Sequence, residues 1–470
     1  MTASDICERG AVELSELIHS RRVTCEAVMR AYVERIDLVN PKHNAIVMRI
    51  PADELLAQAQ VCDRELASGH SRGWLHGIPL AIKDTANVKG MPTTLGHAAL
   101  KEALAPEDSP MVARLREAGA LLIGKTNVPE FALGSHTYNQ VFGVTRNALN
   151  PEKSAGGSSG GAAAALALQM LPVADGSDFM GSLRNPAAWN HVYGMRPSQG
   201  LVPFAPGADV WLDQLGTEGP MARHVRDLRA MLVTQSGFHA CRPLSWSLTQ
   251  STTKHRADLK GVRIGWLGDL QGHLAMEPGV LNACESALEK MRAAGATIKP
   301  VMFEMDPEVV WMAWLVWRSL LVGTKIRPVV SRPGAFAQTK PEAIWELEQA
   351  QRYELADFMA ASASRTAFYN AMLKLFNECD MLTLPSAQVW AFDVNADWPK
   401  HIGSRPMDTY HRWMEVTIYA TFAGLPAASV PCGIDPKSGT GMGIQCIGRP
   451  HDDLNLLDML QTLEEAIDKI

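Results

Sequence analysis

The sequence predicts an α/β protein, an α/β/α sandwich with one large mixed β-sheet flanked by helices. Hydrophobic residues make up 47% of the 470-residue chain, which is enough for a large core. Short apolar runs alternate with longer segments of helical periodicity, and this is the strand–helix–strand order of an α/β sheet. No period of fixed length recurs along the chain, so a solenoid is not expected.

The first 70 residues are predicted to be helical. Apolar residues between positions 11 and 38 follow a helical spacing with one break, so two or three helices should open the chain. Residues 77–83 form a short apolar run behind a glycine and a proline, which predicts a buried strand. Residues 111–118 then predict a helix and 120–123 another strand.

The rest of the chain continues this alternation. A loop of small residues at 156–161 precedes an uncharged segment, 162–170, which predicts a buried helix. Proline, glycine and serine between 328 and 339 indicate a surface excursion. Residues 173–175 lead into a second tight region at 177–184. Further strands are predicted at 261–267, 296–300, 427–431 and 442–445, and further helices at 278–294 and 453–469.

We expect a single domain over residues 1–470, because a large α/β enzyme keeps one continuous sheet. Its parts would be N-terminal helices over 1–70, a catalytic core over 71–230, a variable substrate-side region over about 240–400, and C-terminal strands with a helix over 401–470.

Charge and cysteine usage narrow the function classes. The chain has 44 basic and 50 acidic residues without a long run of either sign, so we expect no nucleic-acid or membrane partner and a small, weakly charged substrate. Its eight cysteines are scattered, which indicates free thiols rather than a disulfide framework or a metal site. No stretch approaches ~18 uninterrupted apolar residues, and a cytoplasmic location is predicted.

Three polar residues stand where core formation alone would not place them. Lys83 ends an apolar strand, Ser158 lies in the Gly/Ser loop, and Ser182 lies in a second turn of small residues. Each alone has a structural explanation, as a snorkelling lysine, a flexible connector or a helix cap. Together they favour a reactive site, because glycine-rich turns present backbone N–H groups to an anion or an oxyanion.

On these motifs the chain resembles the amidase signature family over almost its whole length. The family's GGSSGG element is present at 156–161, and its first serine, Ser158, precedes Ser182 by 24 residues, as in the family. Residues 77–84 resemble the segment that carries the family's catalytic lysine, here Lys83. Supporting matches occur at Asn40-Pro41, Asn44-Ala45, 124–127, Arg146-Asn147, Gly194, Arg196-Pro197, 219–223 and 424–426.

The resemblance implies a serine amidohydrolase with a Ser-cisSer-Lys triad and no cofactor. Lys83 would act as the base, since burial can lower a lysine pKa to near neutrality. Ser158, joined to Gly157 by a cis peptide bond, would relay the proton, and Ser182 would form an acyl-enzyme. The oxyanion hole would consist of the backbone N–H groups of Phe179, Met180, Gly181 and Ser182.

Other residues are expected to support the loops or to bind substrate. Ser159 adjoins the relay serine, and Asp178 and Arg184 flank the nucleophile turn, where a buried ion pair explains them equally well. The spacing of Trp311, Trp314 and Trp317 is helical, and it leaves a core stripe and a pocket wall both open. Tyr138 is a further pocket candidate.

Three features depart from the family pattern and put the substrate in doubt. Met180 stands where the family usually has glycine, Trp189-Asn190-His191 replaces a more common Phe-Cys-Gly-like stretch, and 441–445 differs from the usual C-terminal motif. The expected substrate is a small carboxylic amide, while the same acyl transfer would cover an aryl amide, an ester or a carbamate, the last a urethanase activity. A homodimer is left open.

Three rival functions are less favoured. Residues 119–126 match the P-loop expression, but its four middle residues form an apolar strand and Pro129 follows, so nucleotide binding is not expected. A glutaminase subunit of a tRNA-dependent amidotransferase would need a partner protein. A non-catalytic binding protein on this fold would not need the lysine and both serines.

Overall fold

The computed structural model describes residues 1–204, 209–249 and 258–467, and it contains the predicted mixed sheet flanked by helices. Eight strands follow the order β10-β9-β11-β15-β14-β7-β8-β6. Strand β9 is parallel to β10 and β11, and the other neighbours are antiparallel. The strands are β6 (Val173–Asp178), β7 (Tyr193–Arg196), β8 (Thr217–Ala222), β9 (Arg263–Trp266), β10 (Thr297–Pro300), β11 (Met381–Pro385), β14 (Ala427–Ile434) and β15 (Gly441–Ile447).

A separate three-stranded sheet lies beside the edge strand β6. It has the order β1-β3-β2 and consists of β1 (Ile46–Arg49), β2 (Pro79–Lys83) and β3 (Leu121–Thr126). Every residue of β2 is buried, and the N–H of Lys83 donates to the Asp175 carboxylate on β6 at 3.0 Å. The predicted strand with Lys83 therefore belongs to this small sheet, which the sequence did not separate from the large one.

The P-loop match forms regular strand. Strand β3 continues through Gly124, Lys125 and Thr126, so these residues pair with β1 and β2 instead of forming a phosphate-binding loop. This agrees with the rejection of a nucleotide site.

Four helices, rather than two or three, occupy the first 70 residues. They are α1 (Ala3–Glu8), α2 (Ala11–His19), α3 (Cys25–His43) and α4 (Ala52–Ala67). Helix α1 is only six residues long, too short for periodicity to reveal, and its start is held by a capping box between Thr2 and Asp5. The predicted break before α3 is confirmed, with Thr24 as the N-cap.

Helices cover the large sheet and follow both serine-bearing loops. Helices α7 and α9 contact β14 and β15, and α8 contacts β7 and β8. Residues Gly160 to Leu166 of α6 are all buried, as its lack of charge predicts. The helices are α5 (Pro110–Glu117), α6 (Gly160–Ala167), α7 (Arg184–Trp189), α8 (Val225–Gln235), α9 (Val280–Ala293), α13 (Ile418–Phe422) and α14 (Asp453–Ile467).

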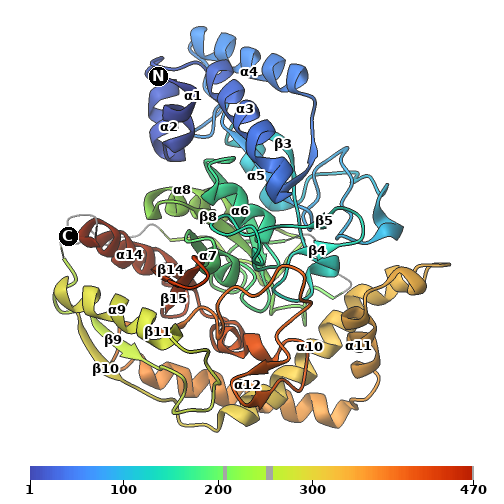
Figure 1. Ribbon diagram of the computed structural model, residues 1–470, viewed down its shortest axis with the longest axis vertical. Coiled ribbons are helices and arrows are strands. Elements are labelled where there is room, and N and C mark those ends of the chain that lie inside the picture. The colour runs from blue at the N-terminus through green and yellow to red at the C-terminus, as the bar shows by residue number, and fades with distance from the viewer. Residues whose placement is uncertain (205–208, 250–257, 468–470) are drawn as a thin grey trace.

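Two long helices and a shorter one form the end of the molecule opposite α1 to α4 (Figure 1). They are α10 (Pro307–Val330), α11 (Pro341–Gln349) and α12 (Leu355–Leu375). The predicted surface excursion at 328–339 begins later than expected, because α10 keeps Pro328 in its last turn and runs on to Val330.

Helix α10 is also long and apolar enough to cross a membrane. Its most apolar window has a mean hydropathy of 1.3, but 67% of that window is buried within the protein. No uninterrupted apolar run marks it in the sequence, because Arg318 and Ser319 lie within it. Its burial is that of a core helix.

The remaining elements are short. They are the strands β4 (Tyr138–Asn139), β5 (Gly143–Val144), β12 (His401–Ile402) and β13 (Arg405–Pro406), and the 3₁₀ helices at Ala98–Leu100, Glu130–Ala132, Phe336–Gln338 and Arg412–Thr417.

Candidate active site

Lys83 is buried among hydroxyl groups at the end of β2. Its Nζ donates to Ser158 Oγ at 2.8 Å, to Ser159 Oγ at 2.8 Å and to Ser177 Oγ at 2.9 Å. The side chain is fully buried, and this desolvation lowers the Lys83 pKa to about 7, although the nearby carboxylates of Asp175, Asp178 and Glu218 oppose the shift. Lys83 can therefore lose or gain a proton close to neutral pH.

The Ser158 loop needs glycines because other backbone segments approach it closely. Gly156 has φ +74°, and a Cβ there would lie 2.7 Å from the Asn185 side chain. The Gly157–Ser158 peptide bond is cis, the conformation that the family resemblance implies. Ser159 donates its backbone N–H to the carbonyl oxygen of Ser182 at 3.1 Å. The two serine-bearing loops are thus joined directly.

Ser182 lies on the wall of a cavity of about 350 Å³. It is 6% exposed, and Gly181 before it has φ +80°, a conformation that favours glycine. The cavity gives a small molecule access to the Ser182 residue, while the lysine network lies behind it in the interior.

One of the four predicted oxyanion-hole donors is already engaged. The N–H of Gly181 donates to Asp178 Oδ1 at 2.9 Å, and the N–H of Leu183 donates to the other carboxylate oxygen. In the described part of the chain no such hydrogen bond engages the N–H groups of Phe179, Met180 or Ser182. Of the four predicted donors, these three N–H groups are therefore the ones left for an oxyanion, because a carboxylate engages the fourth.

Asp178 and Arg184 form a buried ion pair that supports the turn bearing Ser182. Arg184 donates to both carboxylate oxygens, at 3.0 and 2.9 Å, and also to Gln445 Oε1 at 2.7 Å. Burial would raise the pKa of Asp178, but Arg184 and Arg196 outweigh it and lower the pKa to about 2. The pair fixes the turn in one conformation, which matches the structural explanation considered for these residues.

Apolar side chains from distant segments line most of the cavity. Apart from Phe179 and Met180 in the turn before Ser182, these residues could not be found from motifs, since no local pattern marks them. They include Leu95, Phe131, Leu133, Phe179, Met180, Phe204, Val322, Ile326 and Met414.

Most of the charged residues of the cavity wall have a counter-charge, either on the wall or behind it. Arg318 donates to Glu346 at 2.7 Å and to Tyr410 at 2.6 Å. Lys325 forms an ion pair with Asp213 at 2.8 Å. A ligand in the cavity therefore meets apolar surface and neutralised charges.

The predicted aromatic pocket residues do not lie on this cavity. Trp311 and Trp314 are fully buried in the core, and Trp314 contacts the cavity only through Phe179, whose ring centroid is 5.5 Å away. Tyr138 lines a separate hollow, where Lys340 lies over its ring. Burial favours the core interpretation of the tryptophan stripe.

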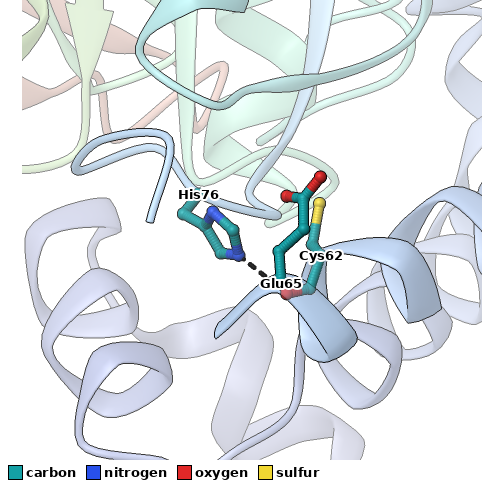
Figure 2. Close-up of side chains that lie close together, drawn as sticks. All are labelled: Cys62, Glu65 and His76. Atoms are coloured by element: carbon teal, nitrogen blue, oxygen red, sulfur yellow. Dashed lines mark hydrogen bonds between the residues drawn. The ribbon is translucent and has the colours of Figure 1, made fainter. Parts of the chain in front are cut away.

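One cluster with metal-ligand chemistry lies outside the site, between α4 and the loop before β2. Cys62, Glu65 and His76 place one ligand atom each within 4.8 Å of one another (Figure 2). Both ring nitrogens of His76 are engaged, with the N–H of Arg72 at 3.1 Å and the carbonyl oxygen of Cys62 at 2.9 Å. Glu65 pairs with Arg72 at 2.7 Å. These interactions account for the cluster as structural.

The chain is similar to known proteins over nearly its whole length. The family model described as Amidase matches residues 27–457. A glutamyl-tRNA(Gln) amidotransferase subunit of Thermosynechococcus vestitus is 31% identical, over 96% of each chain. A bacterial aryl acylamidase of the amidase signature family has a TM-score of 0.90 at 27% identity, covering 97% of this chain and 96% of that one. The corresponding amidotransferase subunit of Thermotoga maritima has a TM-score of 0.79 at 25% identity, covering 98% and 95%.

Proposed function

Because the chain belongs to the amidase family, as its motifs predicted, we propose that it cleaves a neutral, largely apolar carboxylic amide. As a member of this family it is a hydrolase of C–N amide bonds. It acts without a partner protein. Ser182 is the nucleophile, Ser158 the relay and Lys83 the base. The observation that carries this assignment is the buried Lys83 amine, which is hydrogen-bonded to the Ser158 and Ser159 hydroxyls. No described carboxylate lies within ion-pair distance of that amine.

The reaction uses one proton path in both directions. Neutral Lys83 accepts the Ser158 proton while Ser158 takes the proton of Ser182, whose oxygen then bonds to the substrate carbonyl carbon. The oxyanion is stabilised by the N–H groups of Phe179, Met180 and Ser182. The C–N bond breaks as the amine receives its proton back through Ser158. Water then attacks the acyl-enzyme by the same path and releases the acid.

The cavity supports a neutral substrate over glutamine. Free glutamine carries an ammonium and a carboxylate group, and burying either without a counter-charge is costly. The cations on the wall are already paired, Arg318 with Glu346 and Lys325 with Asp213. An amide with an apolar acyl or aryl group needs no such partner, and an ester or carbamate of the same shape would react by the same steps.

The rival function, a glutaminase subunit, is favoured by one observation. A relative 31% identical over 96% of this chain is a glutamyl-tRNA(Gln) amidotransferase subunit. That function predicts glutamine hydrolysis only in a complex with a partner protein, whereas the proposed amidase acts alone.

The first test is intact mass after treatment with a fluorophosphonate. We expect one adduct on the wild type and none on Ser182→Ala. Ser135→Ala is the matched control, because Ser135 lines the same cavity and should not be modified. An adduct that persists in Ser182→Ala would overturn the assignment.

The substrate test follows with the protein alone. A panel of anilides, aliphatic amides, esters, carbamates and glutamine should give turnover of the neutral compounds and none of glutamine. Glutamine as the sole substrate, and only after a partner protein is added, would replace the proposal with the glutaminase function.

A further inference from the structure

A second titratable group, Glu218, lies beside the lysine network and has no role in the steps above. Resting on the proposed function of Lys83, we propose that Glu218 is a positioning residue that sets the pH at which Lys83 becomes a base: Lys83 can accept a proton only while Glu218 holds its own. Glu218 lines the same cavity as Ser182 and is 5% exposed.

The sheet places Glu218 next to the hydroxyl partners of Lys83. Strands β8 and β6 are antiparallel, and Glu218 lies directly opposite Ser177. Opposed residues of an antiparallel pair project from the same face of the sheet. The Ser177 hydroxyl accepts from Lys83 Nζ at 2.9 Å, so the carboxyl group of Glu218 and the lysine amine share one side of this strand pair.

The Glu218 carboxyl lacks what an ionised form requires. Its Oε2 is buried, and no hydrogen-bond partner for it exists in the described residues. An unpaired buried carboxylate is far more costly than the neutral acid. Burial, followed by the negative charge of Asp175, raises the pKa of Glu218 to about 8.

Three cations oppose this rise, and two of them lie close to other carboxylates. Lys83, Arg242 and Lys125 each lower the Glu218 pKa. Arg242 lies 3.5 Å from Asp213, a carboxylate that it shares with Lys325. Lys125 lies 3.8 Å from the Asp84 carboxylate. The third cation, Lys83, has serine hydroxyls and no carboxylate among its hydrogen-bond partners in the described residues.

Lys83 and Glu218 therefore share a proton between two arrangements. In one, Lys83 is a neutral amine and Glu218 a neutral acid, and the enzyme can accept the Ser182 proton. In the other, Lys83 is an ammonium ion and Glu218 a carboxylate, and the base is blocked. Both hold the same number of protons, so they titrate as a pair. Glutamine at position 218 removes the blocked arrangement, because an amide does not ionise.

The test is the pH dependence of fluorophosphonate reaction at Ser182, followed as a rate between about pH 5 and pH 9. In Glu218→Gln the midpoint of the acid limb should shift to lower pH by roughly half a unit or more, since the charge that raises the Lys83 pKa is gone. Glu130→Gln is the matched control. It changes another buried carboxyl whose pKa is raised by burial, and it should leave the midpoint in place because Glu130 is not among the charges that act on Lys83 or Glu218.

An unchanged or raised midpoint in folded Glu218→Gln would overturn the inference. Glu218→Ala, which also cannot ionise, should move the midpoint in the same direction and covers the case in which glutamine disturbs the fold. Failure of the proposed function has a different signature, because the wild type would then form no adduct on Ser182 at any pH.

Discussion

Two buried lysines lie at the ends of neighbouring strands of the small sheet, and their surroundings differ. Lys83 is the last residue of β2, and Lys125 is the second-last residue of β3, where it pairs with Ile82 of β2. Both side chains are fully buried, and burial lowers both pKa values. Lys83 donates to three serine hydroxyls at 2.8–2.9 Å and, at 3.4 Å, to the carbonyl oxygen of Ser177. Lys125 donates to the carbonyl oxygen of Ala86 at 2.5 Å and, at 3.4 Å, to the Thr93 hydroxyl, and it lies 3.8 Å from Asp84.

Because the two lysines are equally buried but have different hydrogen-bond partners, burial alone does not make a lysine a base. A carbonyl oxygen and a carboxylate can only accept hydrogen bonds, so the nearest hydrogen-bond partner of Lys125 and the Asp84 carboxylate favour its charged form. A hydroxyl group can donate or accept, so the partners of Lys83 serve both of its protonation states. Lys83 is thus suited to proton transfer and Lys125 to holding the fold.

Removal of the nucleophile tests whether the hydroxyl network of Lys83 leads to chemistry at all. We expect Ser182→Ala to lower kcat by at least about a thousandfold while Tm stays within about 2 °C, because the change deletes one hydroxyl on a cavity wall. Turnover and thermal unfolding of the purified protein check this. Normal turnover by the variant would show that Ser182 is not the nucleophile served by the Lys83 network.

Substituting each lysine in turn tests directly whether Lys83 serves catalysis and Lys125 serves stability. Lys83→Met should lower kcat by about a thousandfold with little loss of stability. Lys125→Met should instead destabilise the protein by about 3 kcal/mol, since it leaves the buried Asp84 carboxylate without its cation. Denaturant unfolding and turnover per folded molecule separate the two effects. Equal losses of kcat in both variants would contradict the division of roles.

The pH profile sharpens the same distinction. Below a pKa of about 7 Lys83 carries a proton and cannot act as a base, so kcat/KM should rise with pH through about 7. Each pH unit below the midpoint should cost about tenfold. Initial rates on an anilide across the acid range measure this limb. An activity that falls as pH rises through 7 would rule out the neutral lysine as base.

The ion pair behind the nucleophile turn should matter for both stability and rate. Asp178→Asn leaves the buried Arg184 without its carboxylate, and we expect a loss of about 3 kcal/mol in the free energy of unfolding. The loosened turn should lower kcat by about tenfold. Denaturant unfolding and steady-state kinetics check both values, and an unchanged Tm would show that the turn is held by other contacts.

The smallest expected effect concerns the cavity wall. Met180→Gly restores the family's usual glycine and removes a thioether whose sulfur lies 3.7 Å from Arg318. KM for a small apolar amide should rise a few-fold, about 2–5, with kcat nearly unchanged, because packing against the substrate is lost in the ground state and transition state alike. A fall in kcat alone would instead place Met180 in the oxyanion turn.

Most of the elements near the site were predictable, because each depends on a short segment. The strand with Lys83, the glycine-rich loop and the buried helix after it follow from local apolar runs and small residues. The residues that line the cavity wall were not predictable from the sequence, and α10 illustrates the reason. Its tryptophans have helical spacing, yet Arg318, Val322, Lys325 and Ile326 of the same helix are the residues that line the cavity. A helix buried on most sides gives no periodic signal for the face that meets a ligand.

The sequence by itself determined the family, the spacing of the two serine loops and the identity of the lysine near them, since motifs record residues close together in the chain. Only the tertiary structure decided which lysine meets hydroxyl groups and which meets a carboxylate. Lys83 and Ser158 are 75 residues apart, and Asp175 is 92 residues from Lys83. A pKa depends on burial and on such distant neighbours, and both are set only when the chain has folded.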